Sequence, residues 1–275
     1  MNFLKRAINK FERTVYSEEK RAQIFLKRNP NKIKFECPVC NYHGPFIDMS
    51  ARTGVRKHAK CLNCSSLERH RLLYLAMKEL SKQHDFSTMS FLHFAPEEFF
   101  RSQFKSWFAT YETADLFMGN VDHKVDVCDL PFQDNSYDFL CASHVLEHIE
   151  DDELAIEEFY RVLKPGGIAI LPVPIVSDRT VEYPEANPLE HDHWRAPGAD
   201  YFDKYRTFFD SVTEYASTSF PAENQVFVYE DRTIWPTKEM PLRPSMKGDK
   251  HIDLIPVCFK KSLVEDESSI PLKVR

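Results

Sequence analysis

Four of the seven cysteines fall in two close pairs whose spacing is typical of metal sites. The pairs are Cys37 with Cys40 and Cys61 with Cys64. Two thiolates from each tight turn can complete a tetrahedral shell around one zinc ion. His43 and His58 lie nearby in the sequence but are not needed as ligands. A segment this short has little core of its own, and ligation would supply its stability. The spacing therefore predicts a structural zinc ribbon at residues 31–65.

A second group of reactive side chains follows an apolar run at residues 137–142. The group consists of Ser143, His144, Glu147 and His148. Open α/β sheets bind ligands outside the carboxyl ends of their strands. Because a buried strand is expected at this run, these side chains would stand where such a sheet binds its ligands. Histidine is the natural general base near neutral pH.

The elements expected around these residues alternate between strand and helix. The expected strands are residues 89–94, 111–114, 124–128, 137–142 and 168–173. Helices are expected at residues 65–80 and 98–108, and a third one ends at the Lys-Pro-Gly-Gly turn of residues 164–167. This alternation predicts a doubly wound α/β fold.

Three motifs in this region resemble the core of class I AdoMet-dependent methyltransferases of the type 11 family. They are the strand entry LPFQDNSYD, the helix start HVLEH and the turn VLKPGG. The turn LHFAPE is similar to that of family members that carry a zinc ribbon. The resemblance implies a Rossmann-like seven-stranded sheet, preceded here by the small four-cysteine zinc ribbon. It also implies S-adenosyl-L-methionine (AdoMet) as the methyl donor.

The resemblance further implies which residues bind the cofactor. Family members have a glycine-rich loop after the first strand, whereas the seven glycines of this chain form no G-x-G, and Ala95, Glu97 and Phe99 take their places. Asp115 would accept hydrogen bonds from the ribose hydroxyls, and Asp129 with Leu130 would hold the adenine. The predicted cofactor-binding residues are His93, Phe94, Ala95, Pro96, Glu97, Asp115, Leu116, Asp129, Leu130 and Ser143.

The function expected from the resemblance is methyl transfer to an oxygen or nitrogen of a small molecule or glycan, by in-line displacement. A hydroxyl or amine acceptor also has to lose a proton. The candidate bases are His144, His148 and His193. His193 lies in a dense polar and aromatic stretch at residues 190–195 that is expected either to contact the substrate or to form a structural loop. Its His-Asp-His run is not expected to chelate one ion, because neighbouring residues on a strand point to opposite sides.

Other functions remain open. An RNA methyltransferase could grip phosphates with basic residues around the second cysteine pair, which are Arg52, Arg56, Lys57, Lys60, Arg69 and Arg71. The missing glycines are also compatible with a non-catalytic binding module that keeps the fold. A zinc-dependent interaction protein with an acidic body is a further alternative.

The expected domain organisation is a basic amphipathic helix at residues 1–30, the ribbon at 31–65, a methyltransferase domain at 66–260 and a polar tail at 261–275. A substrate or lid insert is expected at residues 175–200. The stripe of the first helix consists of Phe3, Leu4, Ala7, Ile8 and Phe11. Such a helix could contact a membrane surface or RNA, although packing on its own domain is favoured.

Within the main domain, residues 201–215 are expected to form a helix. Residues 225–229 and 252–259 are expected to form the antiparallel pair that closes the sheet. The chain has no run of 18 apolar residues and no apolar signal core at its start, so a cytoplasmic location is expected.

Overall fold

The computed structural model describes residues 18–51 and 54–262, which form two compact units. The first unit contains the described residues up to Leu75 together with 217–231 and 248–253. The second contains residues 76–216, 232–247 and 254–262. These boundaries differ from the expected ones, because two late segments belong with the cysteine-bearing unit. The expected apolar stripe of the first helix lies outside the described residues.

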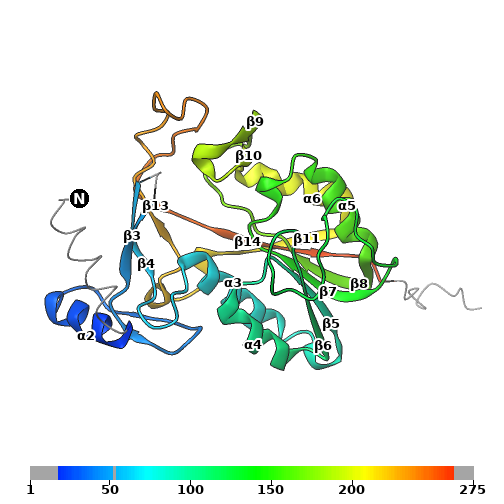
Figure 1. Ribbon diagram of the computed structural model, residues 1–275, viewed down its shortest axis with the longest axis horizontal. Coiled ribbons are helices and arrows are strands. Elements are labelled where there is room, and N and C mark those ends of the chain that lie inside the picture. The colour runs from blue at the N-terminus through cyan, green and yellow to red at the C-terminus, as the bar shows by residue number, and fades with distance from the viewer. Residues whose placement is uncertain (1–17, 52–53, 263–275) are drawn as a thin grey trace, which may run out of the picture. The chain divides into compact units, whose positions relative to one another are not determined.

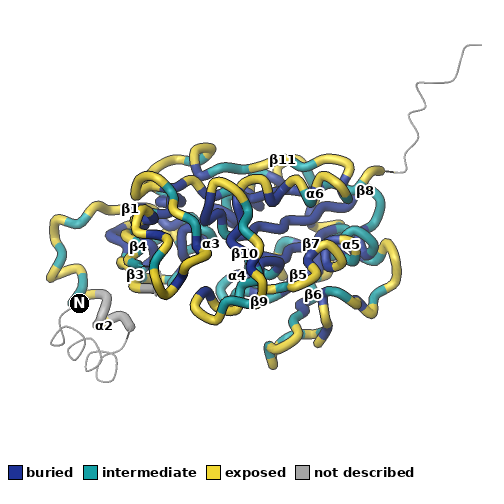
Figure 2. The backbone as a smooth tube through the Cα atoms, turned by 90° about the horizontal axis from the view of Figure 1, so that it is seen from above, coloured by how far each residue is buried: buried dark blue, intermediate teal, exposed yellow. Residues whose placement is uncertain are grey.

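The second unit is built on a six-stranded sheet. In order across the sheet its strands are β11 (Ser211–Ala216), β14 (Leu254–Phe259), β8 (Leu163–Ile170), β7 (Tyr137–Ala142), β5 (Ser90–Phe94) and β6 (Thr110–Ala114). The four strands from β8 to β6 are parallel to one another, and β14 runs antiparallel to both of its neighbours. The backbone of these central strands is largely buried (Figure 2).

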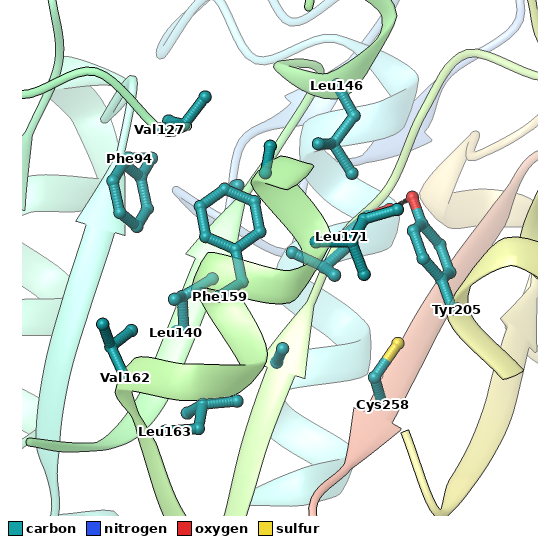
Figure 3. Packing of buried hydrophobic residues seen from close by; sticks show 14 of the residues in the cluster. Phe94, Val127, Leu140, Leu146, Phe159, Val162, Leu163, Leu171, Tyr205 and Cys258 are labelled. Carbon is teal, nitrogen blue, oxygen red and sulfur yellow. Dashed lines mark hydrogen bonds between the residues drawn. The ribbon is translucent and has the colours of Figure 1, made fainter. Parts of the chain in front are cut away.

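Helices cover both faces of this sheet (Figure 1). α4 (Glu98–Trp107) packs on one face, where the rings of Phe104 and Phe91 have centroids 5.8 Å apart. α5 (Asp152–Val162) packs on the other, where the Phe159 ring lies 5.0 Å from that of Phe94. Figure 3 shows this second layer, in which Phe159 of α5 lies near Phe94 of β5 and Leu140 of β7. The expected doubly wound α/β fold is therefore confirmed.

The expected number of strands was wrong for the described residues. Residues 124–128 form no strand, and in this region the chain makes only isolated bridges, including a parallel one from Ala114 to His123. Tight turns replace the strand, since the Asp126 carboxylate accepts a hydrogen bond from the Cys128 N–H at 2.9 Å. Asp side chains favour such local bonds over sheet pairing. Val125 and Val127 are nevertheless buried in the core.

The expected helix at residues 201–215 was only half right. α6 (Phe202–Phe208) ends early, and Ser211–Ala216 becomes the edge strand β11, paired with β14 from Ser211 opposite Phe259 to Ala216 opposite Leu254. Val212 and Thr213 are β-branched, which favours a strand. The antiparallel pair that completes the sheet is therefore β11 with β14, and residues 225–229 take no part in it.

The insert after β8 contains a two-stranded hairpin. Its strands are β9 (Val181–Asn187) and β10 (His193–Ala196). Short 3-10 turns complete the second unit: η1 (Phe86–Thr88), η2 (Leu146–His148), η3 (Pro188–Glu190) and η4 (Ala199–Tyr201). The hairpin turn contains His191 and Asp192, both with left-handed backbone at φ 61° and 62°.

The first unit contains two small sheets. One pairs β1 (Phe35–Glu36) with β2 (His43–Gly44), and the other has the strand order β13 (Lys250–His251), β12 (Val228–Tyr229), β4 (Gly54–Lys60) and β3 (Ile47–Ala51). Residues 225–229 thus supply a strand here. The remaining elements are α2 (Glu18–Arg28), η5 (Ser217–Ser219), η6 (Ala222–Asn224) and α3 (Glu68–Leu80), which begins in this unit. No helix among the described residues is long and apolar enough to cross a membrane.

Candidate functional site

The two cysteine pairs sit on matching backbone turns. The Asn41 N–H donates to the Cys37 carbonyl at 2.8 Å, and the Ser65 N–H donates to the Cys61 carbonyl at 3.1 Å. Asn41 and Ser65 have left-handed backbone at φ 58° and 65°. This shared geometry aims both thiols of each pair at one point, as a ligand turn must.

The four sulfurs lie at distances that suit a tetrahedral ion. The Sγ atoms of Cys37 and Cys64 are 3.6 Å apart, and those of Cys40 and Cys61 are 3.8 Å apart. Zinc–sulfur bonds of about 2.3 Å in a tetrahedron separate the sulfurs by about 3.8 Å. Hydrogen bonds from the neighbouring thiols Cys61 and Cys64 lower the pKa of Cys37. At this site the group that could hold a metal ion is made of the four cysteines, without His43 or His58.

Buried arginine braces the second cysteine turn. The Arg71 side chain is fully buried and donates hydrogen bonds to the carbonyls of Ser66, Ala59 and Gln225 at 2.7, 3.1 and 2.6 Å. Arg56 Nε donates to Glu68 Oε1 at 2.8 Å. Two of the basic residues expected to grip RNA are therefore engaged within the unit itself.

At the carboxyl end of β5 the chain turns in a conformation that favours glycine. Ala95 has φ 45°, and its N–H donates to the Ala114 carbonyl at the end of β6 at 3.0 Å. The His93 ring is buried and its Nδ1 shares a 2.9 Å hydrogen bond with the Tyr111 hydroxyl. Phe94 is buried against α5. His93 and Phe94 therefore offer a ligand only their backbone.

Glu97 stands at the start of α4. Its Oε2 lies 3.6 Å from His93 Nε2, and the Glu97 side chain is 17% exposed. The sequence places Pro96 just before it. The predicted loop from Ala95 to Glu97 thus has side chains where the related family has glycines, and a left-handed backbone at its first position.

Asp115 follows β6 and caps the loop after it. Its Oδ1 accepts hydrogen bonds from the N–H groups of Phe117 and Met118 at 2.6 and 2.7 Å. Within the described residues Oδ2 has no hydrogen bond. The next two side chains, Leu116 and Phe117, are 45% and 86% exposed. A carboxylate oxygen and an exposed apolar surface therefore lie side by side in the chain.

Asp129 and Leu130 differ in what they can offer a ligand. Asp129 is exposed, whereas the Leu130 side chain is part of the core. The Leu130 N–H donates to Glu158 Oε2 at 2.7 Å, and the Leu130 carbonyl accepts from Arg161. Leu130 is therefore held by its own domain through both backbone groups and its side chain.

All three predicted catalytic histidines gather around Glu147. His144 Nδ1 lies 3.2 Å from Glu147 Oε1, and this carboxylate side chain is 1% exposed. The rings of His148 and His193 are 4.6 Å apart, centroid to centroid, at 88°. His144 has left-handed backbone at φ 55°, which turns the chain directly after β7 and the buried Ser143.

The pKa of His193 is lowered to about 4, mainly because the ring is buried away from water. The neighbouring histidines lower this pKa further, and Glu147 acts in the opposite direction. At neutral pH the ring is therefore neutral. His193 Nδ1 is buried and has no hydrogen-bond partner in the part of the chain that the structure describes.

Arg195 fixes the hairpin strand that carries His193. This buried side chain donates to the carbonyls of Leu146, Ile149 and Glu150 at 2.9, 2.6 and 3.0 Å. It also contacts Glu182 on β9 at 2.8 Å. These bonds hold β10 against η2, the turn that presents Glu147 and His148. His191, two positions before His193, is not a member of the cluster.

Sequence reasoning noted Glu147 among the polar residues but gave it no role in the site. Glu147 is central to the site because Arg195 holds the hairpin strand with His193 against η2. No local sequence pattern indicates this long-range contact. Sequence reasoning also did not single out Phe117, the exposed aromatic residue two positions after Asp115.

Residues 108–171 match a family model described as a methyltransferase domain. The matched segment contains β6, β7, α5 and β8, and with them Asp115, Asp129 and the group at residues 143–148. The family predicted from the sequence motifs is therefore confirmed for this segment.

Curated relatives match over short stretches of about fifty residues. Demethylmenaquinone methyltransferase of Staphylococcus carnosus is 47% identical over 45 residues, which cover 16% of this chain and 19% of the relative. The ubiquinone/menaquinone biosynthesis C-methyltransferase of Pseudoalteromonas translucida is 39% identical over 51 residues, covering 18% and 20%. The chain thus spans about a fifth of the length of these relatives.

Two solved structures are similar over more of the chain. The 1,6-didemethyltoxoflavin-N1-methyltransferase of Burkholderia thailandensis is 13% identical, covers 71% of this chain and 79% of its own, and has a TM-score of 0.48. An S-adenosylmethionine-dependent methyltransferase of Mesorhizobium loti is 12% identical, covers 69% and 98%, and has a TM-score of 0.44. By its matched segment and its own sheet topology, this chain carries a type 11 methyltransferase domain segment at residues 108–171, within a Rossmann-like class I methyltransferase fold.

Proposed function

We propose that this chain is an AdoMet-dependent methyltransferase that acts on a small-molecule or glycan acceptor. The observation that carries the proposal is the position of Asp115. It lies inside the family-matched segment, at the carboxyl end of a parallel strand, with one carboxylate oxygen bonded to its own loop and the other left for a ligand. Ligands of open α/β sheets bind at this end of the strands.

The residues at this edge fit a nucleoside with a charged tail. Asp115 Oδ2 would accept hydrogen bonds from ribose hydroxyls, and Leu116 and Phe117 would cover a face of the base. The backbone from His93 to Glu97 would run beside the amino-acid tail, with Asp129 toward the adenine amino group. Leu130 would lie beside the cofactor without a hydrogen bond to it, because its backbone groups are already bonded to Glu158 and Arg161.

AdoMet would supply an activated methyl group, so the work of the protein is to align the acceptor with it. We propose that His144 is the base that takes the proton from the methyl acceptor. The His144 ring is oriented by Glu147, whose carboxylate lies 3.2 Å away. His193 is a weak base, because burial lowers its pKa to about 4. Ser143 directly precedes His144 in the chain.

The names of the matched relatives support a small acceptor, since one is named as a demethylmenaquinone methyltransferase and the other as a C-methyltransferase of ubiquinone/menaquinone biosynthesis. The RNA alternative has less support, because Arg71 and Arg56 are bonded within the first unit. We also propose that the four cysteines bind a structural zinc ion, which the sulfur distances fit.

A calorimetric titration with AdoMet tests the cofactor assignment. Asp115→Asn keeps an oxygen for the loop N–H groups of Phe117 and Met118 but places an amide where ribose hydroxyls need an acceptor. We expect it to weaken binding by roughly 1–3 kcal/mol, the cost of leaving the hydroxyls unpaired.

The matched control is Asp126→Asn, because Asp126 also accepts a backbone N–H two residues ahead, at 2.9 Å. It should leave the affinity unchanged. Absence of heat and of a thermal shift at millimolar AdoMet, or equal affinities for the wild type and Asp115→Asn, would overturn the assignment.

A further inference from the structure

A carboxylate and two imidazoles meet at the carboxyl end of β7. Glu147, His148 and His193 each offer one ligand atom, and these atoms all lie within 4.8 Å of one another. Ligands bonded to one ion at about 2.0–2.2 Å are separated by distances below this limit. The three residues come from two elements, η2 and the hairpin strand β10.

The surrounding structure holds these ligands in place. Arg195 bonds the hairpin to the carbonyls of Leu146 and Ile149, which flank the turn that carries Glu147 and His148. His144 Nδ1 lies beside Glu147 Oε1, the arrangement in which an outer histidine orients a ligating carboxylate. His193 Nδ1 is buried without a hydrogen-bond partner within the described residues.

We propose that Glu147, His148 and His193 bind one divalent transition-metal ion of the zinc class. Three protein ligands of this kind leave one coordination position open, as in zinc sites that bind a water or a substrate oxygen. Imidazole ligands favour zinc, cobalt, nickel or iron over magnesium and calcium, which take oxygen ligands. The open position would accept an oxygen of a small molecule, such as a hydroxyl or a carboxylate.

This site uses different residues from the four cysteines, and the two can be told apart by spectroscopy. Cobalt(II) bound by thiolates gives an intense sulfur-to-metal charge-transfer band, whereas cobalt bound by imidazole and carboxylate gives only weak visible bands. The full chain, cleared of metal by a chelator under reducing conditions, is titrated with cobalt(II), and uptake is followed by calorimetry and absorption. We expect one ion with the thiolate band and a further ion without it.

His193→Asn should weaken uptake of the ion without the thiolate band by more than about 100-fold, since loss of an outer-shell partner alone costs 10- to 100-fold. His191→Asn is the matched control, because this exposed histidine lies in the same hairpin outside the cluster, and it should bind as the wild type does. Glu147→Gln should behave like His193→Asn. An intact thiolate band in each variant verifies that the chain is folded.

The inference is overturned if the wild type takes up only the thiolate-bound ion. It is also overturned if both His193→Asn and Glu147→Gln keep the further ion at unchanged affinity, or if excess magnesium displaces it. Metal uptake is measured without any methyl transfer. The metal site can therefore be absent while the proposed function is correct, and the proposed function can be wrong while the metal site is present.

Discussion

Ala95 shows how a loop without glycine adopts a backbone that favours it. At φ 45° its Cβ crowds the following carbonyl, which costs a non-glycine residue roughly 1–2 kcal/mol. The Ala95 N–H bond to Ala114 holds this turn between the ends of β5 and β6. Ala95 thus forms the bend for which the related family uses glycines.

Ala95→Gly should stabilise the protein by up to about 1 kcal/mol, because relief of the strain exceeds the added entropy of the unfolded chain. Ala95→Val should destabilise it, since β-branched residues tolerate this conformation least. Urea unfolding of both variants measures the difference. A loss of stability in Ala95→Gly would show that the alanine methyl packs favourably in this bend.

Glu158 is the residue that ties the chain around Leu130 to α5. Hydrogen bonds from Arg161 and from the Leu130 N–H lower the pKa of Glu158 below its ordinary 4.5. A carboxyl whose pKa is lowered by folding stabilises the protein above its ordinary pKa, and this stabilisation is lost as the pH falls through the folded value.

Glu158→Gln should therefore lower the free energy of unfolding at pH 7, and the difference from the wild type should shrink as the pH falls below about 4.5. The control Glu157→Gln, an exposed neighbour on the same helix, should behave as the wild type at every pH. Urea unfolding midpoints of the wild type and both variants, measured across this pH range, test the prediction. A difference that stays constant with pH would show that the Glu158 charge contributes nothing.

Single residues were predictable where their chemistry depends on the local chain. The four cysteines were predicted from their spacing, and Asp115 from its place after an expected strand together with the resemblance to the methyltransferase family. Glu147 was not assigned, because its role depends on His193, which the Arg195 clamp brings back from another part of the chain.

At the scale of elements, the hairpin β9–β10 depends on the Arg195 clamp. Arg195→Met would leave three buried or half-buried carbonyls without their donor, which should cost roughly 1–3 kcal/mol. Hydrogen exchange should then speed up over residues 181–196, while β7 and β8 keep their protection. Arg179→Met, an exposed arginine of the same insert, is the control. Unchanged exchange in the hairpin of Arg195→Met would show that other contacts hold it.

Elements were predictable from sequence where hydrophobic burial is continuous. β7 matches its expected bounds because Tyr137–Ala142 is an apolar run buried on both faces. β11 was missed, because aromatic residues of 201–215 recur at helical intervals, while pairing with β14 decides the state of Ser211–Ala216. The strand expected at 124–128 failed for the opposite reason, since local Asp turns took precedence over pairing.

At the scale of the whole molecule, the chain enters the cysteine-bearing unit twice between β11 and β14, the last two strands of the central sheet in chain order. Residues 217–231 and 248–253 supply β12 and β13 to its four-stranded sheet. A linear domain boundary could not be read from composition, because these segments join the ribbon only through long-range pairing, such as Tyr229 with Lys57.

Removal of metal from the four thiolates should therefore loosen the first unit. Chelation should expose residues 37–66 to limited proteolysis, while the sheet of the second unit resists cleavage. Cys64→Ser should show the same pattern without a chelator. Cys128→Ser, which alters a cysteine outside the cluster, should retain zinc and the wild-type cleavage pattern. Resistance of residues 37–66 in the metal-free protein would contradict a structural role for the ion.

The proposed methyltransferase activity depends on a nucleoside sulfonium binding at the carboxyl ends of β5 and β6. The most direct test is a crystal structure of the chain with S-adenosylhomocysteine, the product of methyl transfer. We predict both ribose hydroxyls within hydrogen-bond distance of the Asp115 carboxylate, with the base beside Leu116 or Phe117. A nucleoside bound elsewhere, or Asp115 facing solvent with no ligand at this edge at saturating concentration, would contradict this binding mode.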